Sequence, residues 1–258
     1  MGNKEKAKAY YTTVSSYDEP TIKKMVHKNY IQHNPKVPSG REAFLSMIPK
    51  LKQYGSTIKN IRMLEDGQHI IMHHKWLNAT PFGYDTTAAF HIIRFDNNGL
   101  IAEHWNVMTE MTAANVSGRS LLDGETEITE IKKTEINKAK ITELFYTLTN
   151  ESKEKIIAVL PQFFQPDFHQ HNTVLGDGIQ NLIQAIRKEI FFPQYKKQHA
   201  VFGEGNFVLS VSEGLFLEKN SALYDLFRLK DGKIASHWSI YQDIPTKDLA
   251  NTNTMFNF

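Results

Sequence analysis

Apolar residues follow two different periods in the first 110 residues of the chain. Over residues 4–31 they recur at the three- and four-residue spacing of amphipathic helices, and the Asp-Glu-Pro at 18–20 separates a first helix from a second. Residues 41–51 continue the pattern as a third helix. The pattern then changes to that of strands, which we expect at 58–64, 69–76, 86–95 and 100–108. Helices followed by antiparallel strands indicate an α+β layer with the helices on one face of the sheet.

The same order of features occurs a second time. Residues 30–48 read YIQHNPKVPSGREAFLSMI, and residues 168–186 read FHQHNTVLGDGIQNLIQAI. Further on, GLIAEHW at 99–105 matches GKIASHW at 232–238. Matches that keep one order, with small insertions between them, predict a tandem duplication of a domain with its own core.

The repeat sets the expected domain boundaries. We expect a first domain over 1–120, a linker over 121–137 and a second domain over 138–258. The linker is acidic, since it holds five Asp or Glu residues and two Lys residues. Each repeat ends in an extended tail, and Met255, Phe256 and Phe258 are expected to dock the second tail on a partner surface.

Composition excludes several classes of protein. The 30 Lys and Arg against 28 Asp and Glu give a net charge of +2 without a basic cluster, so no nucleic-acid partner is expected. The absence of Cys excludes disulfides and thiolate chemistry. The N-terminal residues lack the apolar stretch of a secretory signal, and no long apolar run occurs, so we expect a cytoplasmic protein with no membrane partner. Without a Gly-rich phosphate loop or a Rossmann fingerprint, no cofactor is expected.

The repeated motifs resemble a known family. YIQHNPKVPSGREAF with FHIIRFDNNGLIAEHWNVM, and FHQHN with DLFRLKDGKIASHWSIYQ, resemble the SnoaL-like group of the nuclear transport factor 2-like superfamily, which includes polyketide cyclases and ketosteroid-isomerase-like proteins. The resemblance implies that each repeat is a cone, a curved antiparallel sheet wrapped around its N-terminal helices, with an apolar pocket at the open end. It further implies an intramolecular pseudo-dimer of the two repeats, and it allows a homo-oligomer.

The resemblance also indicates where catalytic groups would lie. Catalytic members carry a carboxylate immediately after the EHW segment, where this chain has Asn106 and Ser239, neither of which can take a proton. Related isomerases place an acid one strand earlier, where this chain has His91 and Asp225. Asp225 is either an acid that acts on a ligand oxygen or a wall residue that is hydrogen bonded to Arg228 or to a helix.

The histidines allow two interpretations. His33 and His171 either face the pocket mouth or belong to loops that cap the following helix. His104 and His237 either line the cavity or are satisfied core residues. If His73 converged with the histidines of the first repeat, an acid/base pair or a metal site would be formed, but local metal-ligand spacing is absent and no metal is predicted.

Two functions follow from these residues. The first is a pocket that binds a small apolar metabolite without turnover or with weak activity. The alternative is an acid/base isomerase, cyclase or dehydratase that acts on an apolar molecule bearing a carbonyl. The catalytic candidates are His91, His33, His104, His73, Asp225 and His237. The pocket candidates are Asn106, Asn34, Trp76, His171, Ser239 and Tyr241.

Overall fold

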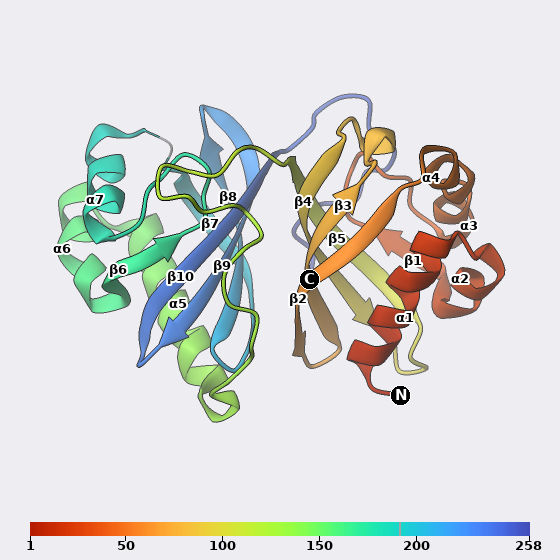
Figure 1. The fold of residues 1–258 in the computed structure, drawn as a ribbon, viewed down its shortest axis with the longest axis horizontal. Helices are drawn as coiled ribbons and strands as arrows, with labels where there is room; N and C mark the ends of the chain where they lie inside the picture. The colour runs from red at the N-terminus through yellow and green to blue at the C-terminus, as the bar shows by residue number, and fades with distance from the viewer. Residues whose placement is uncertain (191) are drawn as a thin grey trace. The chain divides into compact units, whose positions relative to one another are not determined.

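A computed structural model describes residues 1–190 and 192–258. Within these residues, ten strands form two five-stranded sheets, ordered β1-β5-β4-β3-β2 and β6-β10-β9-β8-β7 (Figure 1). Each sheet carries its own helices on one face, as the helical and strand patterns of the sequence predict. The two sheets have the same order, so the sequence repeat is also a structural repeat.

The first repeat begins with helices. They are α1 (Asn3–Ser16), α2 (Glu19–Met25), α3 (Arg41–Leu45), α4 (Ile48–Tyr54) and the short η1 (Thr80–Phe82). Its strands are β1 (Val26–Gln32), β2 (Thr57–Asp66), β3 (His69–Leu77), β4 (Thr86–Phe95) and β5 (Ile101–Glu110). Helix α2 begins where its sequence predicts, because the Asp18 side chain accepts a hydrogen bond from the Thr21 backbone N–H at 3.2 Å and a proline lies in the first turn.

The second repeat has the same plan. Its helices are η2 (Ile131–Lys133), α5 (Thr134–Asn150), α6 (Lys153–Phe163) and α7 (Ile179–Lys188). Its strands are β6 (Phe164–Gln170), β7 (Gln194–Glu204), β8 (Phe207–Phe216), β9 (Lys219–Lys230) and β10 (Lys233–Asp243). The strand register repeats as well, since His91 lies opposite Asn106 in the first sheet and Asp225 lies opposite Ser239 in the second.

Strand β1 differs from the sequence prediction. Its residues were expected to continue the second helix, whereas the structure ends α2 at Met25 and pairs β1 with β5, with Gln32 opposite His104. This pairing is parallel, so each sheet is mixed rather than wholly antiparallel. The hydrogen bonds to β5 outweigh the helical spacing of the apolar residues, because tertiary pairing overrides local preference. The expected third helix is divided into α3 and α4.

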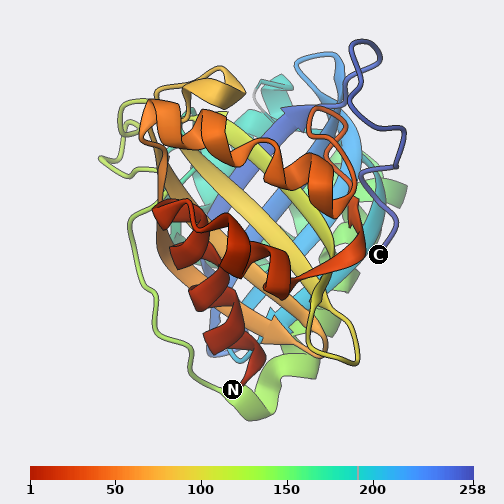
Figure 2. The same cartoon turned by 90° about the vertical axis from the view of Figure 1, so that its right-hand side faces the viewer.

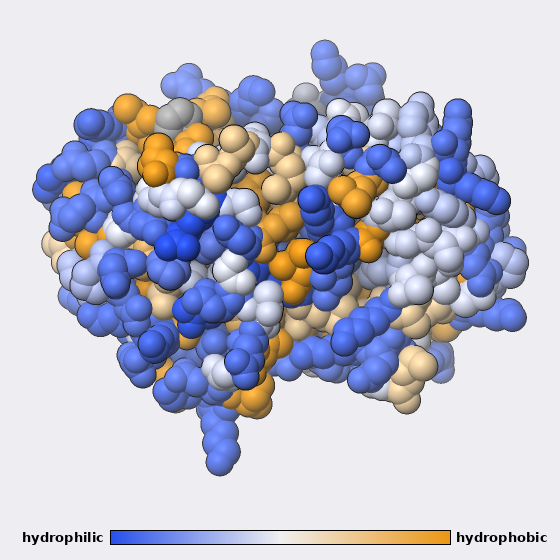
Figure 3. Space-filling view, viewed as in Figure 1, coloured by the Kyte–Doolittle hydropathy of each residue, from blue (hydrophilic) through white to orange (hydrophobic). Residues whose placement is uncertain are grey.

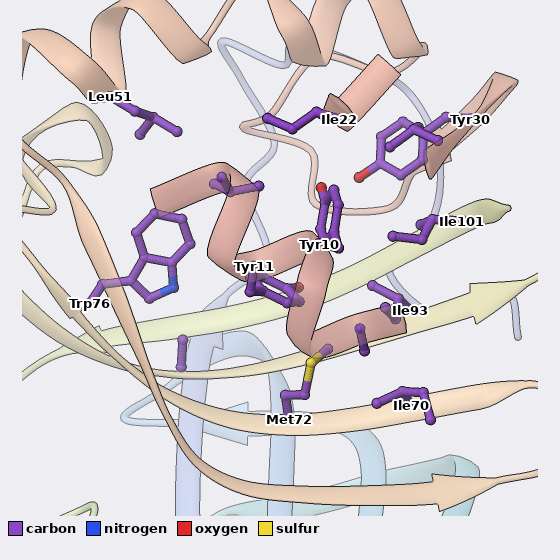
Figure 4. Close-up of a cluster of buried hydrophobic side chains, with 14 of the residues drawn as sticks. Tyr10, Tyr11, Ile22, Tyr30, Leu51, Ile70, Met72, Trp76, Ile93 and Ile101 are labelled. Atoms are coloured by element: carbon purple, nitrogen blue, oxygen red, sulfur yellow. The ribbon is translucent and has the colours of Figure 1, made fainter. Parts of the chain in front are cut away.

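The core of the first repeat lies between its sheet and its helices. Helices α1 to α4 cover one face of the sheet (Figure 2). Tyr10 and Tyr11 of α1 point into this layer with Met72, Ile93 and Ile101 (Figure 4). The indole of Trp76, at the end of β3, is turned toward α1 in the same view. The aromatic side chains of α1 therefore separate the sheet from the outer helices.

The two compact units exchange segments of the chain. Unit 1 consists of Met1–Met111 and Pro245–Asn257, and unit 2 consists of Thr112–Ile244 with Phe258. The tail of the second repeat thus belongs to unit 1, and the acidic linker belongs to unit 2. The predicted boundaries near residues 120 and 138 describe the sequence repeat, whereas each compact unit also includes a segment from outside its repeat.

Hydrophilic side chains cover most of the face drawn in Figure 3, and apolar residues lie there in scattered groups. None of the helices among the described residues has the length and apolar character needed to span a bilayer.

Candidate functional site

Unit 1 contains a cavity between its sheet and helices α1, α3 and α4. The space between its walls measures about 470 Å³, including the part open to solvent. Its walls are mostly apolar and aromatic, with a few polar groups: Tyr10, Tyr11, Val14, Gln32, Val37, Phe44, Met47, Leu51, Trp76, Phe82, His91, His104, Asn106 and Met108. Such a composition is typical of small-molecule sites.

Two histidines on neighbouring strands form the polar centre of this cavity. Nδ1 of His91 on β4 lies 2.8 Å from Nε2 of His104 on β5. The Trp76 indole N–H points at Nε2 of His91 across 3.3 Å, and the Tyr11 hydroxyl lies 3.2 Å from its Nδ1. At the other end, the Gln32 amide nitrogen lies 2.9 Å from Nδ1 of His104.

The hydrogen-bond partners of His104 define its tautomer. The side-chain oxygen of Gln32 accepts from the Asn34 backbone N–H, so its nitrogen must be the donor to His104 Nδ1. A neutral His104 then carries its proton on Nε2, which lies toward Nδ1 of His91. On the other side of the His91 ring, the Trp76 indole N–H donates to Nε2. Donors therefore face both ring nitrogens of His91, and a neutral imidazole can accept at only one of them.

Burial keeps these imidazoles neutral. Desolvation lowers the pKa of His104 to about 3, assisted by the nearby His33. Desolvation, with the charges of His104 and His74, holds the pKa of His91 well below its usual range. Burial also raises the pKa of Tyr11 well above its usual value. The polar groups of the cavity are therefore uncharged donors near neutral pH.

His74 belongs to the same cluster, although the sequence did not single it out. It lies on β3, and its ring centroid is 5.1 Å from that of His91 and 4.5 Å from that of Tyr11. Neither of its ring nitrogens has a hydrogen-bond partner among the described residues. Burial, followed by the charge of His104, lowers its pKa to about 3.

Asn106 offers a free polar atom to the cavity. Its side chain is buried, it lines the cavity, and its amide oxygen has no hydrogen-bond partner among the described residues. The Asn34 amide reaches the backbone oxygen of Asn106 at 3.4 Å rather than its side chain. A carboxamide can turn either its oxygen or its nitrogen toward a ligand.

Unit 2 places a carboxylate where unit 1 has His91. Asp225 is fully buried, and it accepts from His237 Nε2 at 2.9 Å, from the Tyr241 hydroxyl at 2.9 Å and from the Tyr195 hydroxyl at 3.1 Å. Three donors satisfy this acceptor-only group, so the unit 2 network has the partner that the unit 1 network lacks. A cavity beside it is lined by His237 and Tyr195 among apolar residues.

Comparison with known families agrees with this geometry. Residues 7–104 match the family model described as SnoaL-like domain. Residues 7–104 form a SnoaL-like domain. No curated protein matches the chain.

Solved structures similar to part of the chain include an NTF2-like protein of unknown function from Cytophaga hutchinsonii, at 14% identity, covering 42% of this chain and 91% of that one, with a TM-score of 0.36. An uncharacterised cystatin-fold protein from Novosphingobium aromaticivorans is 15% identical, and the match covers 42% of this chain and 98% of that one with a TM-score of 0.38. SalBIII, described as an epoxide hydrolase/cyclase-like enzyme with a role in pyran ring formation in the polyether salinomycin, is 18% identical. The match covers 42% of this chain and 90% of that one, with a TM-score of 0.36.

The structure brings some of the predicted residues of the SnoaL-like domain together and separates others. His91, His104, Trp76 and Asn106 line the cavity. His73 lies on the opposite face of the sheet, where its ring stacks on Phe90. The side-chain order along β3 explains this, because successive residues of a strand point to opposite faces and His74 takes the cavity side.

His33 and His171 hold extended segments instead of facing a cavity. The His33 ring stacks on Trp105 at 4.4 Å, and its Nδ1 donates to the Thr254 carbonyl of the C-terminal tail at 2.8 Å. In unit 2 the His171 ring stacks on Trp238 at 4.5 Å, and its Nδ1 lies 3.0 Å from the Ser120 carbonyl. The repeated QHN and HW motifs thus form a repeated site for an extended segment.

The remaining predicted residues lie near the unit 2 network. The Ser239 hydroxyl accepts from the Asn172 amide at 2.9 Å, and the Tyr241 hydroxyl binds Asp225. Sequence reasoning missed Tyr11, Gln32 and Tyr195 as polar partners. The repetition of Gln32 as Gln170 was a signal for Gln32, but nothing in the local pattern marked Tyr11 or Tyr195. Among the described residues, no group of His, Asp and Glu is arranged to hold a metal ion.

Proposed function

We propose that the cavity of the SnoaL-like domain in unit 1 binds a small apolar molecule that carries a hydrogen-bond acceptor such as a carbonyl oxygen. The observation that carries this proposal is that donors from His104 and Trp76 face both nitrogens of His91, which as a neutral ring accepts at only one of them. An acceptor oxygen in the cavity would take the donor that His91 leaves without an acceptor. The amide oxygen of Asn106 provides a further polar contact, and the apolar walls hold the remainder of the molecule.

The same geometry favours binding without turnover in unit 1. A general base works best when its pKa lies near the operating pH, whereas burial lowers the pKa of His104 to about 3 and that of His91 well below normal. None of the residues that line this cavity is an Asp or a Glu. Neutral imidazoles of this kind donate hydrogen bonds and polarise a carbonyl, but they are weak proton acceptors.

Two probes of the same size test this proposal. Cyclohexanone carries a carbonyl, and methylcyclohexane has a similar shape without an acceptor. We expect the chain to bind cyclohexanone more tightly, as measured by the NMR shifts of the β4 backbone amides during titration, which the variants keep. Trp76→Phe keeps an aromatic ring in the wall but removes one donor, which is worth about 1 kcal/mol, so the preference should fall about fivefold.

The matched control is Trp105→Phe. Trp105 lies outside the cavity, where its indole donates to the Asn257 carbonyl at 3.1 Å, so this change should leave the preference intact. Equal affinity for the two probes in the wild-type chain would contradict the proposal. So would a preference that Trp76→Phe leaves unchanged.

A second role, proton transfer, is favoured by one observation in unit 2. The buried carboxylate of Asp225 contacts His237 at 2.9 Å, and His237 in turn lines a cavity. A carboxylate with a histidine between it and a ligand is able to exchange protons with a carbon beside a carbonyl. Exchange of such hydrogens in deuterium oxide is the measurement that tests this role.

A further inference from the structure

The loop that follows β1 is held on its outer side by the C-terminal segment of unit 1. The Asn251 amide donates to the carbonyls of Asn34 and Val37, at 2.8 and 2.7 Å. The Asn253 amide donates to the Gln32 carbonyl at 2.9 Å and lies 3.2 Å from the Ser39 hydroxyl. Two asparagines therefore satisfy the carbonyls of the loop that no sheet partner reaches.

The inner side of the same loop faces the cavity. Gln32 and Val37 are both part of the cavity wall. The Gln32 side chain makes the contact with His104 that defines the tautomer of this ring. Gln32 therefore links the two sites. Its backbone carbonyl contacts the C-terminal segment, and its side-chain amide contacts His104.

We propose that Asn253 is a positioning residue of the cavity, which holds the Gln32 backbone so that the Gln32 amide stays on Nδ1 of His104. This contact keeps the His104 proton on Nε2, toward His91. Without Asn253, the Gln32 carbonyl loses this donor, and the Gln32 amide can turn from His104 to the Tyr30 hydroxyl, which lies 3.1 Å away. His104 Nδ1 can then carry the proton and donate to the Tyr30 hydroxyl at 3.0 Å.

Unit 2 provides a matched comparison within the chain. Asn115 of the linker donates to the Gln170 carbonyl at 2.6 Å, and to the carbonyls of Asn172 and Leu175 at 3.0 and 2.7 Å. This contact corresponds to that of Asn253. The network of unit 2 is centred on Asp225, which has no tautomers, so loss of Asn115 has no imidazole pair to reorganise.

The experiment reads the tautomers directly in the ligand-free chain. Long-range ¹H–¹⁵N spectra of histidine-labelled protein distinguish protonated from bare ring nitrogens, and His91→Gln and His104→Gln assign the signals. In the wild-type chain we expect His104 to be protonated on Nε2. Asn253→Ala and the isosteric Asn253→Asp should each produce a tautomer mixture at His104, and Asn115→Ala should leave this ring unchanged.

Each outcome bears on the positioning role. Wild-type signals in both Asn253 variants would overturn it, as would the same change in Asn115→Ala. Loss of the native amide signals of β4 in both Asn253 variants would show that the segment is needed for folding instead, and would also overturn it. Because no ligand is added, this result is independent of whether the cavity binds cyclohexanone.

Discussion

Unit 1 should lose stability in mild acid because it buries neutral histidines. Burial lowers the pKa of His74 and of His104 from 6.5 to about 3, and it lowers the pKa of His91 in the same direction. The unfolded chain therefore binds protons below pH 6.5 that the folded unit does not bind. The stability of unit 1 is complete above pH 6.5 and falls as the pH is lowered from 6.5 toward 3.

The size of this loss follows from the shifts. At pH 5.0, each of His74 and His104 costs about 2 kcal/mol of unfolding free energy relative to pH 7.5, since one pKa unit is worth about 1.4 kcal/mol. Together they remove about 4 kcal/mol, and His91 adds to the loss. Because a typical domain has about 5–15 kcal/mol of stability, this is a large fraction.

Hydrogen exchange measured by mass spectrometry at pH 7.5 and 5.0, corrected for the intrinsic pH dependence of exchange, checks this prediction. Peptides from β4 should lose at least about 4 kcal/mol of opening free energy. Peptides from β9 should lose much less, because the register places Ser212 and Asp225 in unit 2 where unit 1 has His74 and His91. His74→Ser should recover about half of the loss. Equal losses in β4 and β9, or no loss in β4, would refute the reasoning.

Two further predictions concern unit 2. In deuterium oxide the wild-type chain should catalyse exchange of the hydrogens beside the carbonyl of cyclohexanone, as followed by ¹H NMR. Asp225→Asn should stop this exchange. Exchange that persists in the variant would contradict the proton-transfer role. Arg119 contacts both carboxylate oxygens of Asp177 at 2.7 Å, so Arg119→Ala should lower the unfolding free energy of unit 2 by about 1 kcal/mol in urea titrations, less at high salt, with β4 exchange unaffected.

The repeat and most strands were predictable because two independent signals agree. The strand period, the turn residues and the second copy all place β2 to β5 where the structure has them. Strand β1 was not predictable from its own residues, since its apolar positions also fit a helix and its partner β5 lies far along the chain. The exchange of segments between units is equally non-local. The arrangement of the two repeats as a pseudo-dimer, and any homo-oligomer, stay predictions.

The candidate site was predictable in part for a similar reason. His91, His104 and Asn106 lie on strands whose alternation the sequence shows, and the structure places them together. The choice of His73 over His74 depended on which face of β3 points inward, which a shift of one residue reverses. The contact of Gln32 with His104 depends on the parallel pairing of β1 with β5, so it could not be predicted from the sequence.

The exchange of segments has a consequence for biosynthesis. A ribosome releases the sequence of β1 to β5 first, but residues 245–257, which complete unit 1, follow only after the whole second repeat. The linker that belongs to unit 2 precedes that repeat, so unit 2 has all its parts except Phe258 as soon as β10 emerges. Unit 1 is thus translated first but completed only near the end of synthesis, and during this interval its loop carbonyls depend on water.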